Sequence, residues 1–202
     1  MSNFWARFEK INGRLFRYDT RIYLQPVNNI ETSDICLGAV VGKNPGSAKG
    51  EPSATLKEIN LDGDKLLPTV RNIFLKAYQD ADKELPERSY IQVLNLFYLC
   101  EADLNLAISQ AENETTQETC QTENKLFPFV WFVWGGDDDR LNHFKMRFEF
   151  LKVIQPFYYD NGTIVEKIPE ETSSARHTQG LKHDYVLSYI SNMLKTLEMK
   201  QK

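Results

Sequence analysis

Short apolar runs alternate with amphipathic segments along most of the chain. Three of the runs are nearly continuous, which is typical of strands buried on both faces of a sheet, and they span residues 36–41, 90–97 and 129–134. Apolar residues at helical spacing follow each run, within residues 68–78, 103–111 and 141–151, and again in a C-terminal segment that begins at Asp184. This order predicts an α/β fold, a three-layer sandwich with a mainly parallel central sheet and helices on both faces.

The remaining segments predict smaller features. Two aromatic-rich runs, residues 15–18 and 22–24, predict edge strands or a hairpin before Pro26. An Asp-Asn-Gly sequence at residues 160–162 lies between two further runs and predicts a hairpin turn. The polar tract 112–125 predicts a loop or a mobile insertion.

Composition limits the class of protein. The chain has 202 residues, of which 42% are hydrophobic, so we expect a single domain, with N-terminal strands in residues 1–33 and an α/β core in residues 34–197. A formal net charge of −4 disfavours a strongly basic nucleic-acid binder. The cysteines are scattered without a Cys-x-x-Cys spacing, which disfavours a zinc site or an iron–sulfur cluster.

The chain begins without a long apolar segment, and no later run approaches the length of a membrane span. We therefore expect a soluble cytoplasmic protein with no membrane partner, no cofactor and no metal, and the sequence leaves its oligomeric state open. It contains no Gly-x-Gly-x-x-Gly, P-loop or Gly-x-Ser-x-Gly sequence, which disfavours dinucleotide-binding, kinase and serine-hydrolase functions.

Polar residues stand where the carboxyl ends of parallel strands are expected to meet. Asn44 follows the first apolar run, Asn95 lies near the end of the second, and His177 precedes the last helix. Pro45 fixes the backbone beside Asn44, and Gly46 permits close approach of a ligand. We therefore expect a ligand site here, with an ordinary strand-to-loop turn and a structural loop histidine as the alternatives.

Further residues belong to the same region. Gly42, Lys43 and Ser47 flank the Asn-Pro-Gly turn and are candidate binding residues. The acidic run 137–139 follows a Gly-Gly pair and predicts a cap for the next helix, with a magnesium site as the alternative.

The order of three short motifs resembles that of the uracil-DNA glycosylase-like superfamily, and most of all a widespread bacterial family of uncharacterised proteins within it. The motifs are Asn44-Pro45-Gly46, Pro68-Thr69-Val70-Arg71 and Asn95-Leu96-Phe97. The resemblance extends over residues 35–197, and it implies that superfamily's α/β sandwich.

The resemblance also implies roles for single residues. Asn44 would position the attacking water, Asn95 would read the edge of the base, and His177 would donate a hydrogen bond to the departing base. Leu181 would wedge into a duplex. The motif from His177 to Leu181 departs from the superfamily pattern, because threonine and glutamine follow the histidine in place of proline and serine.

Aromatic residues near the strand ends supply candidate stacking surfaces. Phe97 and Trp134 could stack on a base, with packing in the core as the alternative. Lysines and other basic residues near the motifs could form a rim for phosphates, namely Lys43, Lys49, Arg176, Lys182 and His183.

Two function classes remain open. In the first, the protein is an N-glycosylase that hydrolyses the bond to a nucleobase in DNA or in a nucleotide, and this class requires Asn44, Asn95 and His177 to converge on one pocket. In the second, it is a non-catalytic module on the same fold that binds a nucleotide, a nucleic acid or another protein.

Overall fold

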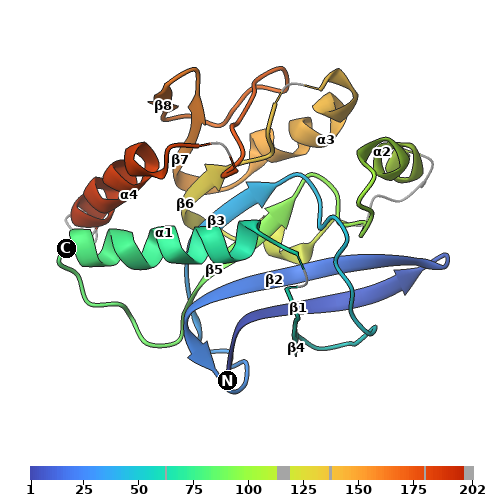
Figure 1. Ribbon diagram of the computed structural model, residues 1–202, viewed down its shortest axis with the longest axis horizontal. Coiled ribbons are helices and arrows are strands. Elements are labelled where there is room, and N and C mark those ends of the chain that lie inside the picture. Colours follow the sequence, from blue (N-terminus) through green and yellow to red (C-terminus); the bar gives the residue numbers. More distant parts are fainter. Residues whose placement is uncertain (62, 113–118, 137, 180, 198–202) are drawn as a thin grey trace.

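The computed structural model describes residues 1–61, 63–112, 119–136, 138–179 and 181–197. In this part of the chain an eight-stranded sheet has the order β4-β1-β2-β5-β3-β6-β7-β8 (Figure 1). The strands are β1 (Ser2–Ile11), β2 (Arg14–Val27), β3 (Ile35–Gly42), β4 (Lys57–Glu58), β5 (Ser89–Asn95), β6 (Phe127–Phe132), β7 (Val153–Asp160) and β8 (Thr163–Val165). The α-helices are α1 (Leu66–Asp80), α2 (Leu104–Glu112), α3 (Asn142–Met146) and α4 (His183–Leu197).

The predicted α/β class is confirmed, but the sheet is mixed, so the prediction of a mainly parallel sheet is not confirmed. Strands β5, β3, β6 and β7 run parallel to one another at its centre. Antiparallel pairs extend both edges, with β2, β1 and β4 on one side and β8 on the other. The parallel strands are the three predicted apolar runs together with β7.

Two-residue turns build both hairpins. Asn12 and Gly13 connect β1 to β2 with φ angles of 50° and 82°, and Asn161 and Gly162 connect β7 to β8 with 44° and 91°. Asparagine and glycine tolerate this left-handed backbone, which matches the twist of a hairpin. The hairpin at residues 160–162 is confirmed. The two N-terminal runs instead form one continuous strand, and its partner β1 was not predicted.

The helices cover both faces of the sheet. Strand β6 shows why, because Phe129 and Trp131 belong to one apolar cluster whereas Val130 and Phe132 belong to the other. Helices α1 and α4 pack in the first cluster and lie beside each other (Figure 1). Helices α2 and α3 pack in the second. The side chains of each face therefore find an apolar partner, as expected for strands that are apolar on both sides.

The segment 113–118 of the predicted loop 112–125 lies outside the described residues. Its remainder holds a 3₁₀ helix, Gln121–Asn124. Glu123 of this helix accepts hydrogen bonds from the Tyr98 hydroxyl at 2.5 Å and from Arg147 Nε at 2.8 Å. These contacts attach the described end of the tract to the fold on the α2 and α3 side of the sheet.

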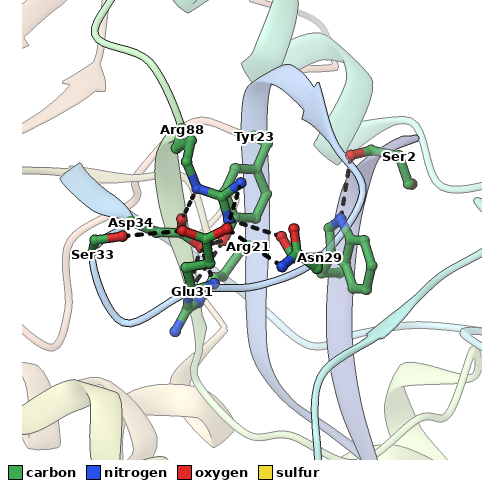
Figure 2. A network of polar contacts seen from close by, with 9 residues as sticks. Ser2, Arg21, Tyr23, Asn29, Glu31, Ser33, Asp34 and Arg88 are labelled. Carbon is green, nitrogen blue, oxygen red and sulfur yellow. Dashed lines mark hydrogen bonds and ion pairs between the residues drawn. The ribbon is translucent and has the colours of Figure 1, made fainter.

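A polar network fixes the amino ends of β3 and β5 (Figure 2). Asp34, whose side chain is 1% exposed, accepts hydrogen bonds from the Tyr23 hydroxyl at 2.5 Å and from Arg88 Nε at 2.6 Å. Burial, together with the hydrogen bond to Asp34, raises the pKa of Tyr23 to about 12. Tyr23 comes from β2 and Arg88 precedes β5, so one carboxylate holds three segments together.

Gly38→Ala is expected to destabilise the fold by about 1–3 kcal/mol, because overpacking a well-filled core has costs of this size. A Cβ atom at Gly38 would lie 2.5 Å from the Phe129 ring, and that ring is itself held by stacking on Phe74 at a centroid distance of 5.1 Å. Urea unfolding measures the change. Gly136→Ala is the matched control, since a Cβ there meets nothing within 4 Å. Equal stabilities of the two variants would contradict this packing.

Candidate functional site

The carboxyl ends of the parallel strands meet at one edge of the sheet. Backbone hydrogen bonds continue past the strand ends, from Leu96 N to Gly42 O at 3.0 Å and from Val133 N to Val41 O at 2.8 Å. The loops that follow β3, β5 and β6 therefore begin side by side. An open parallel sheet binds ligands outside this edge.

Asn44 is held at this edge by the loop after β5. Its Nδ2 donates to the Glu101 carbonyl at 2.7 Å. Its Oδ1 has no hydrogen-bond donor among the described residues, so this atom can accept a hydrogen bond from a ligand or a water. The turn after it is closed by a hydrogen bond from Ala48 N to Pro45 O at 3.3 Å, and Gly46 takes a φ of 59°.

His177 is brought to the same edge by a short backbone pairing. Ala175 and Gly135 exchange two hydrogen bonds, at 2.7 and 2.8 Å, which ties the segment before His177 to the loop after β6. The backbone N–H of Gln179 donates to His177 Nδ1 at 3.2 Å. Because Nδ1 accepts this bond, we assign the proton of the neutral ring to Nε2, which can donate to a ligand.

Both residues border one cavity of about 420 Å³. Its described lining comes from β2, the loops after β3 and β6, the segment before α1 with the first residue of that helix, and the segment before α4: Arg17, Lys43, Asn44, Pro45, Gly46, Ser47, Ala48, Lys49, Asn60, Leu61, Gly63, Asp64, Lys65, Leu66, Trp134, Gly135, His177 and Gln179. The volume is within the range of small-molecule sites in proteins. Seven of the predicted site residues are therefore neighbours in space.

Burial and charge shift the ionisation of the cavity groups. Burial lowers the pKa of the Lys43 ammonium, which the charge of Asp138 only partly offsets. Burial also lowers the pKa of His177, and the nearby positive charge of Lys43 acts in the same direction. Both effects favour a neutral imidazole at neutral pH, which is the form that donates from Nε2 while Nδ1 accepts.

Arg17 and Asp64 form an ion pair in the cavity wall that sequence reasoning missed. Arg17 Nη1 lies 3.2 Å from Asp64 Oδ2, and the other carboxylate oxygen accepts the backbone N–H groups of Leu66 and Leu67 at the start of α1. Asp64 thereby joins the first turn of α1 to strand β2. The signal for Asp64 is an acidic residue just before an amphipathic helix. The sequence signal for Arg17 is weaker, because it consists only of a charged residue within the aromatic run 15–18.

Four predicted binding residues do not line the cavity. Gly42 and Asn95 are buried at the strand ends, and a Cβ at Gly42 would lie 3.1 Å from Asn95 Oδ1 and 3.3 Å from Leu66 Cδ2. Asn95 is 1% exposed, and neither of its amide atoms has a hydrogen-bond partner among the described residues. Leu66, which borders the cavity, and Asn95 thus contact the same point of β3. The three expected residues therefore converge only in part. The buried position of Asn95 counts against the N-glycosylase class, which required all three to meet in one pocket.

The predicted stacking and wedging side chains are packed in the core. Phe97 lies against Phe144 with ring centroids 5.0 Å apart. Leu181 is 8% exposed and belongs to the apolar cluster of α1 and α4, so it offers no wedge at the surface. Trp134 borders the cavity, yet its side chain is wholly buried, with Nε1 donating to the Ser173 carbonyl at 3.3 Å. An aromatic platform needs an exposed ring face, which these rings lack.

The acidic run 137–139 caps a helix, as predicted, through Asp138. Asp137 lies outside the described residues. The Asp138 carboxylate accepts the backbone N–H of Arg140 at 3.2 Å, at the start of a 3₁₀ helix, Asp139–Leu141. Across the described residues, no group of three or more His, Cys, Asp or Glu side chains is arranged to hold a metal ion. None of the helices described is both long enough and apolar enough to cross a membrane.

Of the predicted basic rim, Lys43 and Lys49 line the cavity. His183 instead borders a separate groove of about 240 Å³ between α1 and α4.

Comparisons of the chain with protein-family models, with curated proteins and with solved structures each found no match. The functional argument below therefore starts from the residues of the cavity.

His177 is expected to titrate below its ordinary value of 6.5, because burial and Lys43 disfavour the imidazolium. The unfolded chain then binds this proton more tightly, so acidification below pH 6.5 also destabilises the fold. Lys43→Met is expected to raise the pKa of His177, whereas Lys152→Met, at an exposed lysine before β7, leaves it unchanged. NMR titration of the His177 ring proton measures both, and a midpoint insensitive to Lys43→Met would contradict this arrangement.

Asn95→Leu is expected to raise the free energy of unfolding by about 1–3 kcal/mol, which is the cost of burying an amide without partners. Leucine has a similar size and needs no hydrogen bonds, whereas Asn95→Asp should destabilise because it buries a carboxylate there. Urea unfolding of both variants measures the effects. A stability loss in Asn95→Leu would mean that the amide is satisfied in solution.

Proposed function

We propose that the protein hydrolyses the N-glycosidic bond of a nucleobase, in DNA or in a nucleotide. One observation carries the proposal: the acceptor atom of Asn44 and the donor atom of His177 belong to side chains that border the same cavity, and each is anchored through its other polar atom. A hydrolase of this kind needs an acceptor that holds water and a donor that holds the leaving group.

His177 supports departure of the base. When the bond from C1′ to the base nitrogen breaks, its electron pair goes to the base, which gains negative charge. A neutral imidazole that donates from Nε2 stabilises this charge, and burial maintains the neutral form. Donation of this kind, from a site that is organised beforehand, needs no rearrangement at the moment of bond cleavage.

Asn44 supports the attack of water. An amide oxygen accepts a hydrogen bond but takes no proton at neutral pH, so Asn44 positions the water without activating it as a base. The bond to the base therefore breaks first, and water then adds its hydroxide to C1′ while its second proton goes to the base or to solvent. The hydrogen bond to Glu101 fixes the amide in the orientation that this role requires.

The sequence resemblance and the fold support the same proposal. The Asn-Pro-Gly turn follows a central parallel strand, and helices lie on both faces of the sheet, as in the three-layer sandwich of a uracil-DNA glycosylase-like protein. We propose that the chain has this architecture with added antiparallel edges.

A second candidate function is that of a non-catalytic binding module. The positions of Asn95 and Leu181 favour it, because the residues that would read a base and open a duplex are both buried away from the cavity lining. Such a module would bind a nucleotide in the cavity and release no base.

Base release is expected from at least one substrate in a panel of nucleotides and of single-stranded and mismatched oligonucleotides. Asn44→Ala and His177→Ala should each slow it about 10²–10³-fold, which is the effect of removing one transition-state hydrogen bond. Chromatography of the free bases measures the rate, with His143→Ala, at an exposed histidine of α3, as the control. Binding without release by the native chain would instead establish the binding module.

A further inference from the structure

Cations outnumber carboxylates around the cavity. Among its described lining residues, Arg17, Lys43, Lys49 and Lys65 are basic, and Asp64 is the single acidic side chain. We propose that the ligand is a free nucleoside monophosphate, whose phosphate binds Lys43 and Arg17, and that it is not a base extruded from DNA. This inference rests on the proposed function only for the presence of a base, since phosphate binding does not require catalysis.

Lys43 is the first anchor for the phosphate. Its side chain is half-buried, and a Cβ at Gly135 would lie 3.6 Å from its Nζ, so the ammonium sits against the loop after β6. Within the described parts of the chain its Nζ forms no hydrogen bond and no ion pair. The charge of Asp138 offsets only part of the cost of burying this ammonium, and a phosphate dianion would supply hydrogen-bond acceptors and the remaining charge.

Arg17 is the second anchor. Its side chain is only 4% exposed, and within the described part of the chain its Nε has no hydrogen-bond partner although Nη1 is paired with Asp64. The ion pair with Asp64 engages Nη1, so it leaves the Nε–H as an unused donor. A buried guanidinium with a donor left over is suited to the oxygens of a phosphate, which it can bind through two atoms at once.

Several observations favour a small nucleotide over DNA. Arg17 lies on β2, so the N-terminal hairpin contributes to the cavity wall. A volume of about 420 Å³ is enough for a single nucleotide. Leu181, the residue expected to open a duplex, is buried in the core. A net charge of −4 also opposes a long polyanion more than a ligand with one phosphate.

The reaction on such a ligand is balanced without a further reactant. Water and the nucleoside 5′-monophosphate give the free base and the sugar 5-phosphate. The hydroxide of water is bonded to C1′, the remaining proton ends on the base, and the phosphate is carried through unchanged. Binding of the phosphate to Lys43 and Arg17 therefore positions the glycosidic bond in the cavity.

Titration calorimetry with the native chain tests the inference. The probes are purine and pyrimidine nucleoside 5′-monophosphates, the corresponding nucleosides, inorganic phosphate and single-stranded oligonucleotides. At least one monophosphate is expected to bind ten or more times more tightly than its nucleoside. Lys43→Met should remove that advantage, whereas Lys152→Met, which loses the same charge from an exposed position, should retain it.

The outcomes test the phosphate site and the proposed hydrolysis separately. No binding by any monophosphate, equal binding of nucleoside and monophosphate, or an advantage that survives Lys43→Met overturns the phosphate site. Oligonucleotides that bind more tightly than every monophosphate overturn the choice of a free nucleotide. Phosphate-dependent binding without base release supports the site and overturns only the proposed hydrolysis, whereas base release from nucleosides and nucleotides at equal rates overturns only the site.

Discussion

The parallel register of β3 between β5 and β6 is the constraint on which the site depends. Its hydrogen bonds run on beyond the strands, to the carbonyls of Val41 and Gly42, so three loops begin at one edge. Asn44, Gly135 and the segment paired with Gly135 are neighbours for that reason alone. A shift of β3 by one residue would reverse the faces of its side chains and carry Asn44 out of reach of its anchor at Glu101.

The two ends of the parallel strands hold different polar groups. At the amino ends, Asp34 has its acceptors filled by Tyr23, Arg88 and a backbone N–H group, which holds the loop before β3 in place. At the carboxyl ends, the amide of Asn95 and the Nε of Arg17 are buried and have no hydrogen-bond partner in the part of the chain that the structure describes. Buried side-chain atoms without a partner among the described residues also occur at the amino ends, at Arg21 Nε and Ser89 Oγ, so such atoms do not by themselves mark the ligand edge. The amino ends are thus held by the Asp34 network, and the proposed site lies at the carboxyl ends.

Local pattern was sufficient to predict much of the fold. Residues 36–41, 90–97 and 129–134 are apolar on both faces, so they were recognisable as central strands, and Asn44 and His177 followed from their places beside those strands. The hairpin partner β1 was missed although Asn12-Gly13 is a strong turn signal. The mixed sheet was missed because the pairing of β2 with β5 joins residues about seventy positions apart. A pattern of a few neighbouring residues in the sequence cannot indicate pairing between strands so far apart.

The proposed site was predictable only for residues in the loops that directly follow a strand or precede a helix. Arg17 reaches the cavity through contact with Asp64, 47 residues away, and sequence periodicity cannot show that contact. Asn95 stands at the predicted strand end, but the direction of its side chain follows from the missing side chain at Gly42 and from Leu66. The packing of Phe97 against Phe144 likewise joins two elements, and it decides that this ring belongs to the core.

The most direct measurement is a crystal structure of the chain with a nucleoside 5′-monophosphate, collected with the His177→Ala variant if the native chain consumes the ligand. We expect the glycosidic bond to lie between Asn44 and the position of His177, with the phosphate on Lys43 and Arg17. A nucleotide bound elsewhere, or one whose base points away from both Asn44 and His177, would contradict the central claim that this cavity acts on an N-glycosidic bond.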